Sequence, residues 1–558
     1  MSNQLRFDVE QERLQLDNDV PQITFNRDRI IEFNHRHQSV LGNYDLALKS
    51  GRILQLDPVV NRRSNLGAFR NRQLREASIL AAALPALAVG LHGRGSLMEL
   101  PEDQRTSQIT NELKRANDRT AAQIMSEVLQ TTTEDLPVGE EVVIESTITE
   151  GVRMKPGKEA GGNPTIAVGA LFGKEEHQRR YGMIMPPNVT LLSMGNDVID
   201  GTTKSVKGLH SSLTSLFVTE SGVKRHLPDI YVQGWAAGTN FPEFNPRGTN
   251  LTEAAEIIAN SYGYSDIRKL GAFFLDRARH HPAMDALNEA GIATPTDQDG
   301  DLFPTLVLGL DGLKFPGGQH LNSIIGEIGG SAEWAVGVLP LVWRGGQALG
   351  MLTSHSALTR SGASSEEKWK ERFHFTEEEF MLIQDARFEH KPYFTIDDIL
   401  ERPFAGGVSA FGAITDNVYL PFMEGVRRHE DASVTVWTLV ITSLGQMEAW
   451  ELTFKPRHSI EKSVGLLISP KERLAELDGS DLKAAVGKLL SNGRQRRRYR
   501  VFFTNEYYPA LIPVNNRLVV LHRAIDSLIE RGAWNEMDRE IIDITTELEP
   551  DWFMPHEY

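Results

Sequence analysis

Carboxylates, a glycine and hydroxyls are crowded into one short stretch, Asn196–Gly208, which reads NDVIDGTTKSVKG. It places Asp197 and Asp200 three residues apart and follows them at once with Gly201. A folded core gains nothing from such acids, because each buried carboxylate must find a partner. Two carboxylates can instead hold a hard divalent cation, which can bridge to phosphate. The stretch therefore predicts a site for metal and phosphate, although an ordinary Asp-Gly turn fits the local pattern equally well.

Two hydroxyl side chains, Thr202 and Thr203, continue the same stretch. They come after the apolar run VTLLSM, a predicted strand, and sites on α/β sheets tend to lie where strands end. We expect the threonines to cap a helix that starts near Lys204 and turns its first N–H groups toward an anion. In the alternative interpretation, a threonine only caps the turn at Gly201.

Three further acids stand in contexts that call for an explanation. Asp118 lies within the helical segment RANDRTAA and Glu145 within the strand-like VVIEST. Glu333 lies within GEIGGSAEWAVG, where paired glycines precede an expected helix or strand start. Each is a candidate metal ligand, and each has a plain alternative. Those alternatives are a solvated helix face for Asp118, an edge strand facing water for Glu145, and a helix-start carboxylate facing water for Glu333.

Basic and acidic residues of two later segments are candidates for binding phosphate and sugar. The segment LDRARHHPAM could clamp a phosphate with paired guanidinium and imidazole groups, those of Arg277, Arg279, His280 and His281. A solvated helix face explains it as well. Asp299 and Asp301 lie in TDQDGDLFP, which superficially resembles a calcium loop but lacks the glutamate at the twelfth position and the ligand spacing. An EF-hand is therefore not expected.

The elements that must position these residues mix helices and strands. Apolar periodicity predicts helices over residues 69–91 and 108–129, the second with Ile109, Leu113, Ala121, Ile124 and Val128 on one face. Strands are predicted at Glu140–Thr149, Thr165–Leu171, Val189–Met194 and Thr214–Glu220. Further apolar runs, not assigned individually, are Thr305–Leu310, Ala335–Trp343 and Ser433–Thr442. The pattern predicts layered α and β structure without a strict βαβ alternation.

Composition limits the classes of protein and the chemistry. The chain of 558 residues has a net charge of −16, which argues against general binding to nucleic acid or to an anionic membrane. It has no cysteine, so disulfides, thiolate nucleophiles and Cys-ligated zinc are excluded, and oxygen-rich sites favour Mg²⁺ or Mn²⁺. The run Ser78–Leu91 is too short to span a bilayer and is expected to be a buried helix. The N-terminus does not resemble a secretory signal, so a cytoplasmic protein is expected.

Six short blocks of the sequence resemble, in order, motifs of the class II (GlpX-type) fructose-1,6-bisphosphatases. That family belongs to the lithium-sensitive, metal-dependent sugar- and inositol-phosphate phosphatases. DVIDGT resembles the family's D-P-I-E-G-T, LPDIYV its APDMYM, RARH its KPRH, QDGD its P-D-G-D, GGSAEW its G-G-A-P-E-G, and TDNV its SDNV. The blocks lie at Asp197–Thr202, Leu227–Val232, Arg277–His280, Gln298–Asp301, Gly329–Trp334 and Thr415–Val418. The resemblance covers roughly Phe69 to Phe454.

The resemblance implies a fold and a set of site residues. The fold would be an αβαβα sandwich of alternating helix and sheet layers. Metal ligation is implied for Asp118, Glu145, Asp197 and Glu333, with Mg²⁺ or Mn²⁺ as the cofactor. Asp200 and Thr202 would lie beside the scissile phosphate, with Glu150 as a further catalytic candidate. Sugar and phosphate binding is implied for Gly201, Thr203, Tyr231, Arg277, Arg279, His280, Asp299 and Asp301.

One strand departs from the family pattern. The family reads G-E-G-E-I-D-E where this chain reads IESTITE, at Ile144–Glu150. Two family acids therefore fall on Thr147 and Thr149, and threonine cannot act as a general base near neutral pH. Activation of water would then rest on the metal, on Thr202 or on Glu150.

These observations predict a phosphatase that uses metal-activated water, with fructose 1,6-bisphosphate or sedoheptulose 1,7-bisphosphate as the substrate that the resemblance implies. Two alternatives stay open: a phosphatase for a specialised sugar, cyclitol or inositol phosphate, and a non-catalytic sensor of sugar phosphate and metal. The expected parts are an N-terminal extension (1–68), a metal-binding subdomain (69–262), a sugar-binding subdomain (263–455) and a mostly helical C-terminal extension (456–558). No partner beyond the sugar phosphate is expected except further copies of the chain, as a homodimer or higher homo-oligomer.

The C-terminal extension contains two features of its own. The basic run RQRRRYR, Arg494–Arg500, fits an anion or effector site, or a surface run that balances an acidic protein. The segment Asn516–Gly532 has helical periodicity and is expected to pack within the molecule or between two copies.

Overall fold

The computed structural model describes most of the chain between residues 46 and 456. The described residues are 46–57, 72–134, 136, 138–151, 164–181, 185–225, 231–238, 244, 249–278, 280–308, 321–352, 393–420, 422–431 and 433–456. The C-terminal extension, with Arg494–Arg500 and Asn516–Gly532, lies outside them, as does most of the N-terminal extension.

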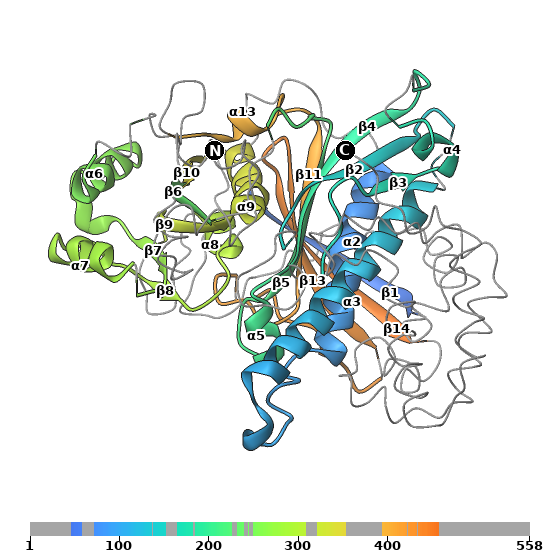
Figure 1. Cartoon of the computed structure of the whole chain (residues 1–558), viewed down its shortest axis with the longest axis horizontal. Coiled ribbons are helices and arrows are strands. Elements are labelled where there is room, and N and C mark those ends of the chain that lie inside the picture. Colours follow the sequence, from blue (N-terminus) through green and yellow to red (C-terminus); the bar gives the residue numbers. More distant parts are fainter. Residues whose placement is uncertain are drawn as a thin grey trace, which may run out of the picture.

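Two sheets of different size form the framework (Figure 1). The large sheet has nine strands in the order β1-β14-β13-β11-β5-β4-β2-β3, with β12 paired to β13. Its strands are β1 (Leu46–Asp57), β2 (Val142–Thr149), β3 (Leu171–Gly173), β4 (Thr190–Asp200), β5 (Leu213–Thr219), β11 (Gly407–Ala413), β12 (Arg427–Arg428), β13 (Val434–Thr442) and β14 (Met447–Pro456). Only β2 and β4 pair in parallel; the other neighbours in this sheet are antiparallel.

The small sheet has five strands in the order β10-β6-β9-β7-β8. They are β6 (Tyr231–Ala237), β7 (Ala272–Leu275), β8 (Thr296–Asp297), β9 (Ser323–Gly330) and β10 (Gln347–Leu352). The helices are α2 (Arg72–His92), α3 (Ser107–Glu134), α4 (Glu175–Gln178), α5 (Thr202–Lys207), α6 (Leu251–Ser261), α7 (His281–Glu289), α8 (Leu302–Val307), α9 (Ser331–Trp343) and α13 (Ile396–Ile399). Two 3-10 turns lie at Glu102–Gln104 and Ile267–Lys269.

The elements stack in five layers, which confirms the predicted αβαβα sandwich (Figure 1). Helices α2 and α3 cover one face of the large sheet, α8 and α9 lie between the sheets, and α6 and α7 cover the outer face of the small sheet. Alternate residues of a strand face opposite layers, because successive strand side chains point to opposite sides. Phe273 of β7 thus packs in the central core, whereas its neighbour Phe274 packs against α6 and α7.

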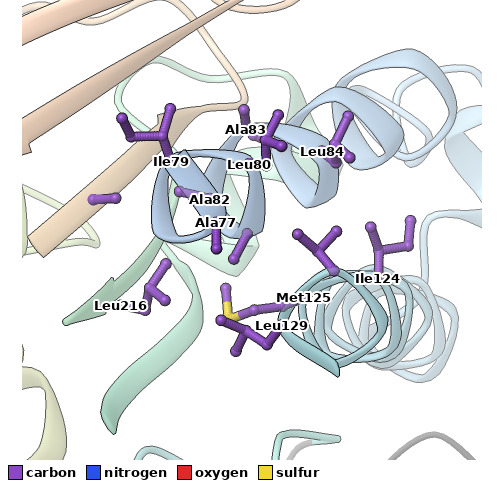
Figure 2. Close-up of a cluster of buried hydrophobic side chains, with 14 of the residues drawn as sticks. Ala77, Ile79, Leu80, Ala82, Ala83, Leu84, Ile124, Met125, Leu129 and Leu216 are labelled. Carbon is purple, nitrogen blue, oxygen red and sulfur yellow. The ribbon is translucent and has the colours of Figure 1, made fainter. Parts of the chain in front are cut away.

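Helix α2 is buried because the large sheet and α3 both pack against it (Figure 2). Its apolar run Ser78–Leu91, predicted to be a buried helix, lies within it, and its small alanines let it approach the sheet closely. From α3, Ile124, Met125 and Leu129 close the other side of this cluster. Among the helices that the structure describes, none combines the length and the apolarity needed to cross a membrane.

The close approach of α2 to the sheet depends on Gly412 of β11. A Cβ atom at this position would lie 2.3 Å from the carbonyl oxygen of Ala82 and 2.8 Å from the Cβ atom of Ala86. We expect Gly412→Ala to destabilise the fold by about 1–3 kcal/mol, because backbone and helix must shift to make room. Urea unfolding would measure this, and an unchanged midpoint would contradict the packing described here.

The predicted strands agree with the structure except in one place. Residues 164–170 form a bend, a turn and irregular chain ahead of the three-residue β3, so the strand prediction at Thr165–Leu171 is wrong. This segment forms isolated backbone hydrogen bonds with β2 instead of a continuous ladder, as in the hydrogen bond from the Gly169 amide to the Ser146 carbonyl. Three apolar runs that were not assigned become α8, α9 and β13.

The subdomain boundaries stay predictions, but the chain crosses between the sheets more often than they suggest. Strands β11, β13 and β14 come from the second predicted subdomain and lie in the large sheet. Strand β1, from the predicted N-terminal extension, pairs with β14 at the edge of the same sheet.

Candidate active site

A polar cavity of about 270 Å³ opens where β4 of the large sheet ends and α9 begins. This volume is close to the lower end of the roughly 300–1,000 Å³ typical of small-molecule sites. Seven carboxylates and two cationic side chains contribute to its lining, namely Asp118, Glu150, Asp197, Asp200, Asp299, Asp301, Glu333, Lys114 and Arg277. Gly201, Thr202 and Thr203 line it as well. Most of the candidate residues thus converge on one cavity.

An irregularity in β4 brings Asp197 and Asp200 to the same cavity. In a regular strand, residues three apart point to opposite faces. The pairing of β4 with β5 shifts register between these two aspartates, which allows both to line the cavity. Gly201 then turns the chain into α5 with a φ of 72°, a left-handed conformation that glycine adopts without strain.

A second glycine, Gly300, lets the segment Asp299–Asp301 approach Asp200. Its φ is 77°, and a Cβ atom there would lie 3.1 Å from Oδ2 of Asp200. Any other residue would be strained and would press on that carboxylate. The DGD sequence is therefore a tight turn against the carboxylate cluster, in agreement with the absence of an EF-hand pattern.

Asp197, Asp200 and Glu333 suit a hard divalent cation. Each can offer one carboxylate oxygen, and these three oxygens all lie within 4.8 Å of one another. Oδ2 of Asp200 is buried and accepts no hydrogen bond from the part of the chain that the structure describes. A buried carboxylate oxygen without a donor is costly, and a cation would satisfy it. Oxygen donors without sulfur or imidazole are those that Mg²⁺ and Mn²⁺ prefer.

The electrostatics of the three carboxylates indicate the same need for positive charge. Burial raises the pKa of Asp197 well above its usual value, and so do the charges of Glu150, Asp200 and Asp118. Burial also raises the pKa of Glu333, again with nearby carboxylates adding to the effect. The pKa of Asp200 rises to about 7, chiefly through burial, although Lys204 opposes the shift. A divalent cation would relieve this repulsion and keep all three ionised.

The two threonines differ from their predicted role as helix caps. Helix α5 has Gly201 at its N-cap and no side-chain cap. Oγ1 of Thr202 instead lies 3.1 Å from both Oδ1 of Asp118 and the carbonyl oxygen of Ile199. Oγ1 of Thr203 accepts a hydrogen bond of 2.9 Å from Nζ of Lys114. The capping prediction is therefore wrong, because the left-handed glycine starts the helix and leaves both hydroxyls to bind side chains of α3.

Lys114 was missed by the sequence analysis. It lies four residues before Asp118 in α3, and residues spaced by four share a helix face. That spacing could have indicated a lysine beside a candidate metal ligand. Arg277, which was predicted, reaches the cavity from the segment after β7 and contacts the Gln298 carbonyl and, at 3.7 Å, Asp299.

Three candidates are not brought to the cavity. Glu145 lies within β2, and its carboxylate accepts a hydrogen bond from the hydroxyl of Tyr181. The ring of His280 is buried, and its Nδ1 lies 2.8 Å from the carbonyl oxygen of Leu275. The ring of His281 lies 3.0 Å from the carboxylate of Asp276, and none of the three residues lines the cavity. Arg279 and the side chain of Tyr231 lie outside the described part of the chain, so their roles stay predictions.

The threonines that replace acids of the family pattern do not line the cavity either. Oγ1 of Thr147 donates to the carbonyl of Met194 at 3.1 Å. Thr149 is buried in a network with Ser146 and Asn196, at 2.9 and 3.1 Å. Glu150, the first residue after β2, reaches the cavity instead. The substitutions thus leave a carboxylate of this strand at the site.

The five-layer fold and its carboxylate-rich cavity place the chain among the layered α+β phosphatase folds. Residues 112–448 match the model of a family described as bacterial fructose-1,6-bisphosphatase, glpX-encoded, and the chain belongs to that family.

Curated relatives carry names of the same kind. Two are named D-fructose 1,6-bisphosphatase class 2/sedoheptulose 1,7-bisphosphatase, from Synechococcus sp. strains JA-2-3B'a(2-13) and JA-3-3Ab. Each is 25% identical over 253 residues, which is 44% of this chain and 66% of the relative. A protein of the same name from Crocosphaera subtropica is 20% identical over 205 residues, or 37% of this chain and 57% of that protein. The matched region therefore spans slightly less than two thirds of the Synechococcus relatives.

The choice between Glu145 and Glu150 can be tested by metal binding. We expect Glu150→Gln to weaken Mn²⁺ binding by about 10-fold or more, because it removes a carboxylate that faces Asp197 and Glu333. Glu145→Gln is the matched control, since its side chain contacts Tyr181 outside the cavity. Calorimetric titration of both variants would measure the difference, and the reverse order of effects would restore Glu145 as the ligand.

Proposed function

We propose that this protein is a metal-dependent phosphatase that hydrolyses a sugar bisphosphate by direct attack of water, without a covalent enzyme intermediate. Fructose 1,6-bisphosphate and sedoheptulose 1,7-bisphosphate are the substrates suggested by the names of the relatives. The convergence of Asp197, Asp200 and Glu333 on one point of the cavity carries the proposal. Membership of the fructose-1,6-bisphosphatase family supports it.

In this proposal the carboxylates of Asp197, Asp200 and Glu333 hold Mg²⁺ or Mn²⁺, with Glu150 and Asp118 adjacent. The bound ion would polarise a phosphoryl oxygen and lower the pKa of the attacking water. Glu150 lines the same cavity as Asp197 and would accept a proton from that water. The hydroxyl of Thr202, held between Asp118 and the backbone, is placed to contact the phosphoryl group.

The cationic and acidic residues at the other parts of the cavity suit the rest of the substrate. Lys114 and Arg277 supply positive charge for phosphate oxygens. Asp299 and Asp301 offer carboxylate oxygens that can accept hydrogen bonds from sugar hydroxyls. Two cationic side chains in addition to a bound metal ion would favour a substrate with two phosphates over a monophosphate.

Phosphate release from a panel of substrates tests the proposal. The panel holds sugar mono- and bisphosphates, cyclitol phosphates and inositol phosphates, each with Mg²⁺ and with Mn²⁺. Glu333→Gln is the matched variant, because glutamine keeps an oxygen that can accept the Gly330 amide at the start of α9. We expect metal-dependent release that this variant abolishes, with a bisphosphate preferred.

The same panel separates the alternatives. Preference for an inositol or cyclitol phosphate would support a specialised phosphatase. A folded protein that binds metal and bisphosphate but releases no phosphate would overturn the proposal in favour of a sensor.

A further inference from the structure

A second cluster of candidate ligands lies at the opposite end of β2 from the cavity. Glu141 immediately precedes β2, and Glu176 and His177 belong to α4. One ligand atom from each of the three lies within 4.8 Å of the others. Glu150 is nine residues further along the extended chain, which corresponds to about 30 Å. The cluster is therefore separate from the proposed catalytic cavity.

His177 points into this cluster without a hydrogen bond of its own. The residue is only 5% exposed, and neither ring nitrogen has a hydrogen-bond partner among the described residues. Its Nε2 lies 3.7 Å from Oε1 of Glu141 and 3.7 Å from Oε1 of Glu176. A buried polar nitrogen without a partner is costly, so this arrangement calls for a missing group.

The spacing suits a shared metal ion better than direct hydrogen bonds. A separation of 3.7 Å is too long for a nitrogen–oxygen hydrogen bond. Two ligands at about 2.1 Å from a tetrahedral ion lie about 3.4 Å apart. Small movements of the three side chains would bring them to that separation.

The carboxylate of Glu141 is oriented by two neighbouring side chains. Nζ of Lys174 lies 2.6 Å from Oε1, and Nδ2 of Asn188 donates to Oε2 at 2.6 Å. Such outer contacts orient metal ligands in proteins. Because the side chain of Lys174 is 26% exposed, its ammonium can turn into water when a dication enters.

We propose that Glu141, Glu176 and His177 form a second metal site, which binds a dication with affinity for imidazole, such as Zn²⁺. Imidazole nitrogen favours such ions over Mg²⁺, which prefers oxygen alone. Three protein ligands leave a fourth position for water. Glu176 is the exposed member and gives the ion access from solvent. A bound ion would tie α4 to the start of β2.

Zinc titration of the full chain tests this site. The Glu333→Gln protein is used with Mg²⁺ in excess, so that zinc does not report on the catalytic cavity. Zn²⁺ binding is measured calorimetrically in this background and after adding Glu176→Gln or His177→Gln. Glu175→Gln is the matched control, because Glu175 is the neighbouring acid in α4 and pairs with Arg179. We expect one Mg²⁺-resistant zinc ion, weakened on the order of 10–100-fold by either ligand variant and unchanged by the control.

Two results would overturn the proposal. One is the absence of Mg²⁺-resistant zinc binding. The other is equal zinc affinity in the Glu176→Gln variant and its Glu175→Gln control, which would place the ion elsewhere in the chain. This comparison stands even if the buried His177 variant fails to fold, because the Glu176 side chain is 73% exposed and its loss leaves the core intact.

Discussion

Replacing Asp197 with asparagine is expected to lower metal-dependent phosphate release on the order of 10²–10³-fold or more, the largest loss from any single conservative change in the cavity. Asp197 is the central acid, because its carboxylate is close enough to Glu150, Asp200 and Asp118 to be affected by all three charges. Asparagine has nearly the same shape and can still accept the 3.3 Å hydrogen bond from the Ile199 amide. It lacks the negative charge that a divalent cation requires.

Initial rates of phosphate release over a range of Mn²⁺ concentrations would measure this effect. Weaker metal binding should appear as a higher Mn²⁺ requirement, together with a lower rate at saturation. Asp266→Asn is the control, since Asp266 is a surface residue paired with Arg268 far from the acidic cluster. If Asp197→Asn kept its rate and its Mn²⁺ requirement within a few-fold of the unmodified protein, the proposed metal site would be incorrect.

The central part of this site could be predicted because its residues are neighbours in the chain. Asp197, Asp200 and Gly201 lie within five residues, so turn chemistry and ligand chemistry are visible in one short stretch. Their burial and the approach of Glu333 from α9 could not be derived in this way. Those features depend on α9 lying between the two sheets, which is a result of long-range packing.

The choice between two glutamates of one strand shows where local sequence is insufficient. Glu145 has the apolar, β-branched surroundings that suggested a functional carboxylate, whereas Glu150 comes after the strand. Which one reaches the cavity depends on the residue at which β2 ends and on its pairing with β4. The register shift between Ser146 and Ile148 is part of that pairing. Strand ends and register are fixed by partners distant in sequence.

The layer order was predictable only through resemblance to a family. Helical and strand periodicity identified α2, α3, β2, β4 and β5, although β4 continues through Asp200 instead of ending at Met194 as predicted. Nothing local indicates that β11 returns to the large sheet beside β5, or that β1 joins the sheet edge beside β14. Such pairings join residues hundreds of positions apart, and local propensity carries no information about them.

Replacing Asp200 with asparagine is expected to stabilise the metal-free protein, although the same change should lower its activity. The pKa of Asp200 rises from 3.8 to about 7, mainly because the carboxyl is buried. Between these values the folded state binds more protons than the unfolded state, so stability falls as pH rises. Near pH 8 the ionised carboxylate of Asp200 lowers the free energy of unfolding by about 4 kcal/mol. Asp200→Asn should therefore stabilise the metal-free protein near pH 8 by up to this amount, and much less near pH 4.

Urea unfolding in the presence of a chelator, at several values between about pH 5 and pH 8, would measure this prediction. The unmodified protein should lose stability across that range, and the variant should lose less. Asp197 and Glu333, whose pKa values are also raised, account for the pH dependence of stability that the variant keeps. With Mn²⁺ near pH 8 the unmodified protein should be more stable than the variant, because it gains metal-binding energy that the variant lacks. Parallel pH profiles for the two metal-free proteins would contradict it, since they would mean that Asp200 is ionised in the fold at no cost. Such a result would imply that Lys204, which pairs with Asp297 at 2.6 Å, already compensates the charge of Asp200.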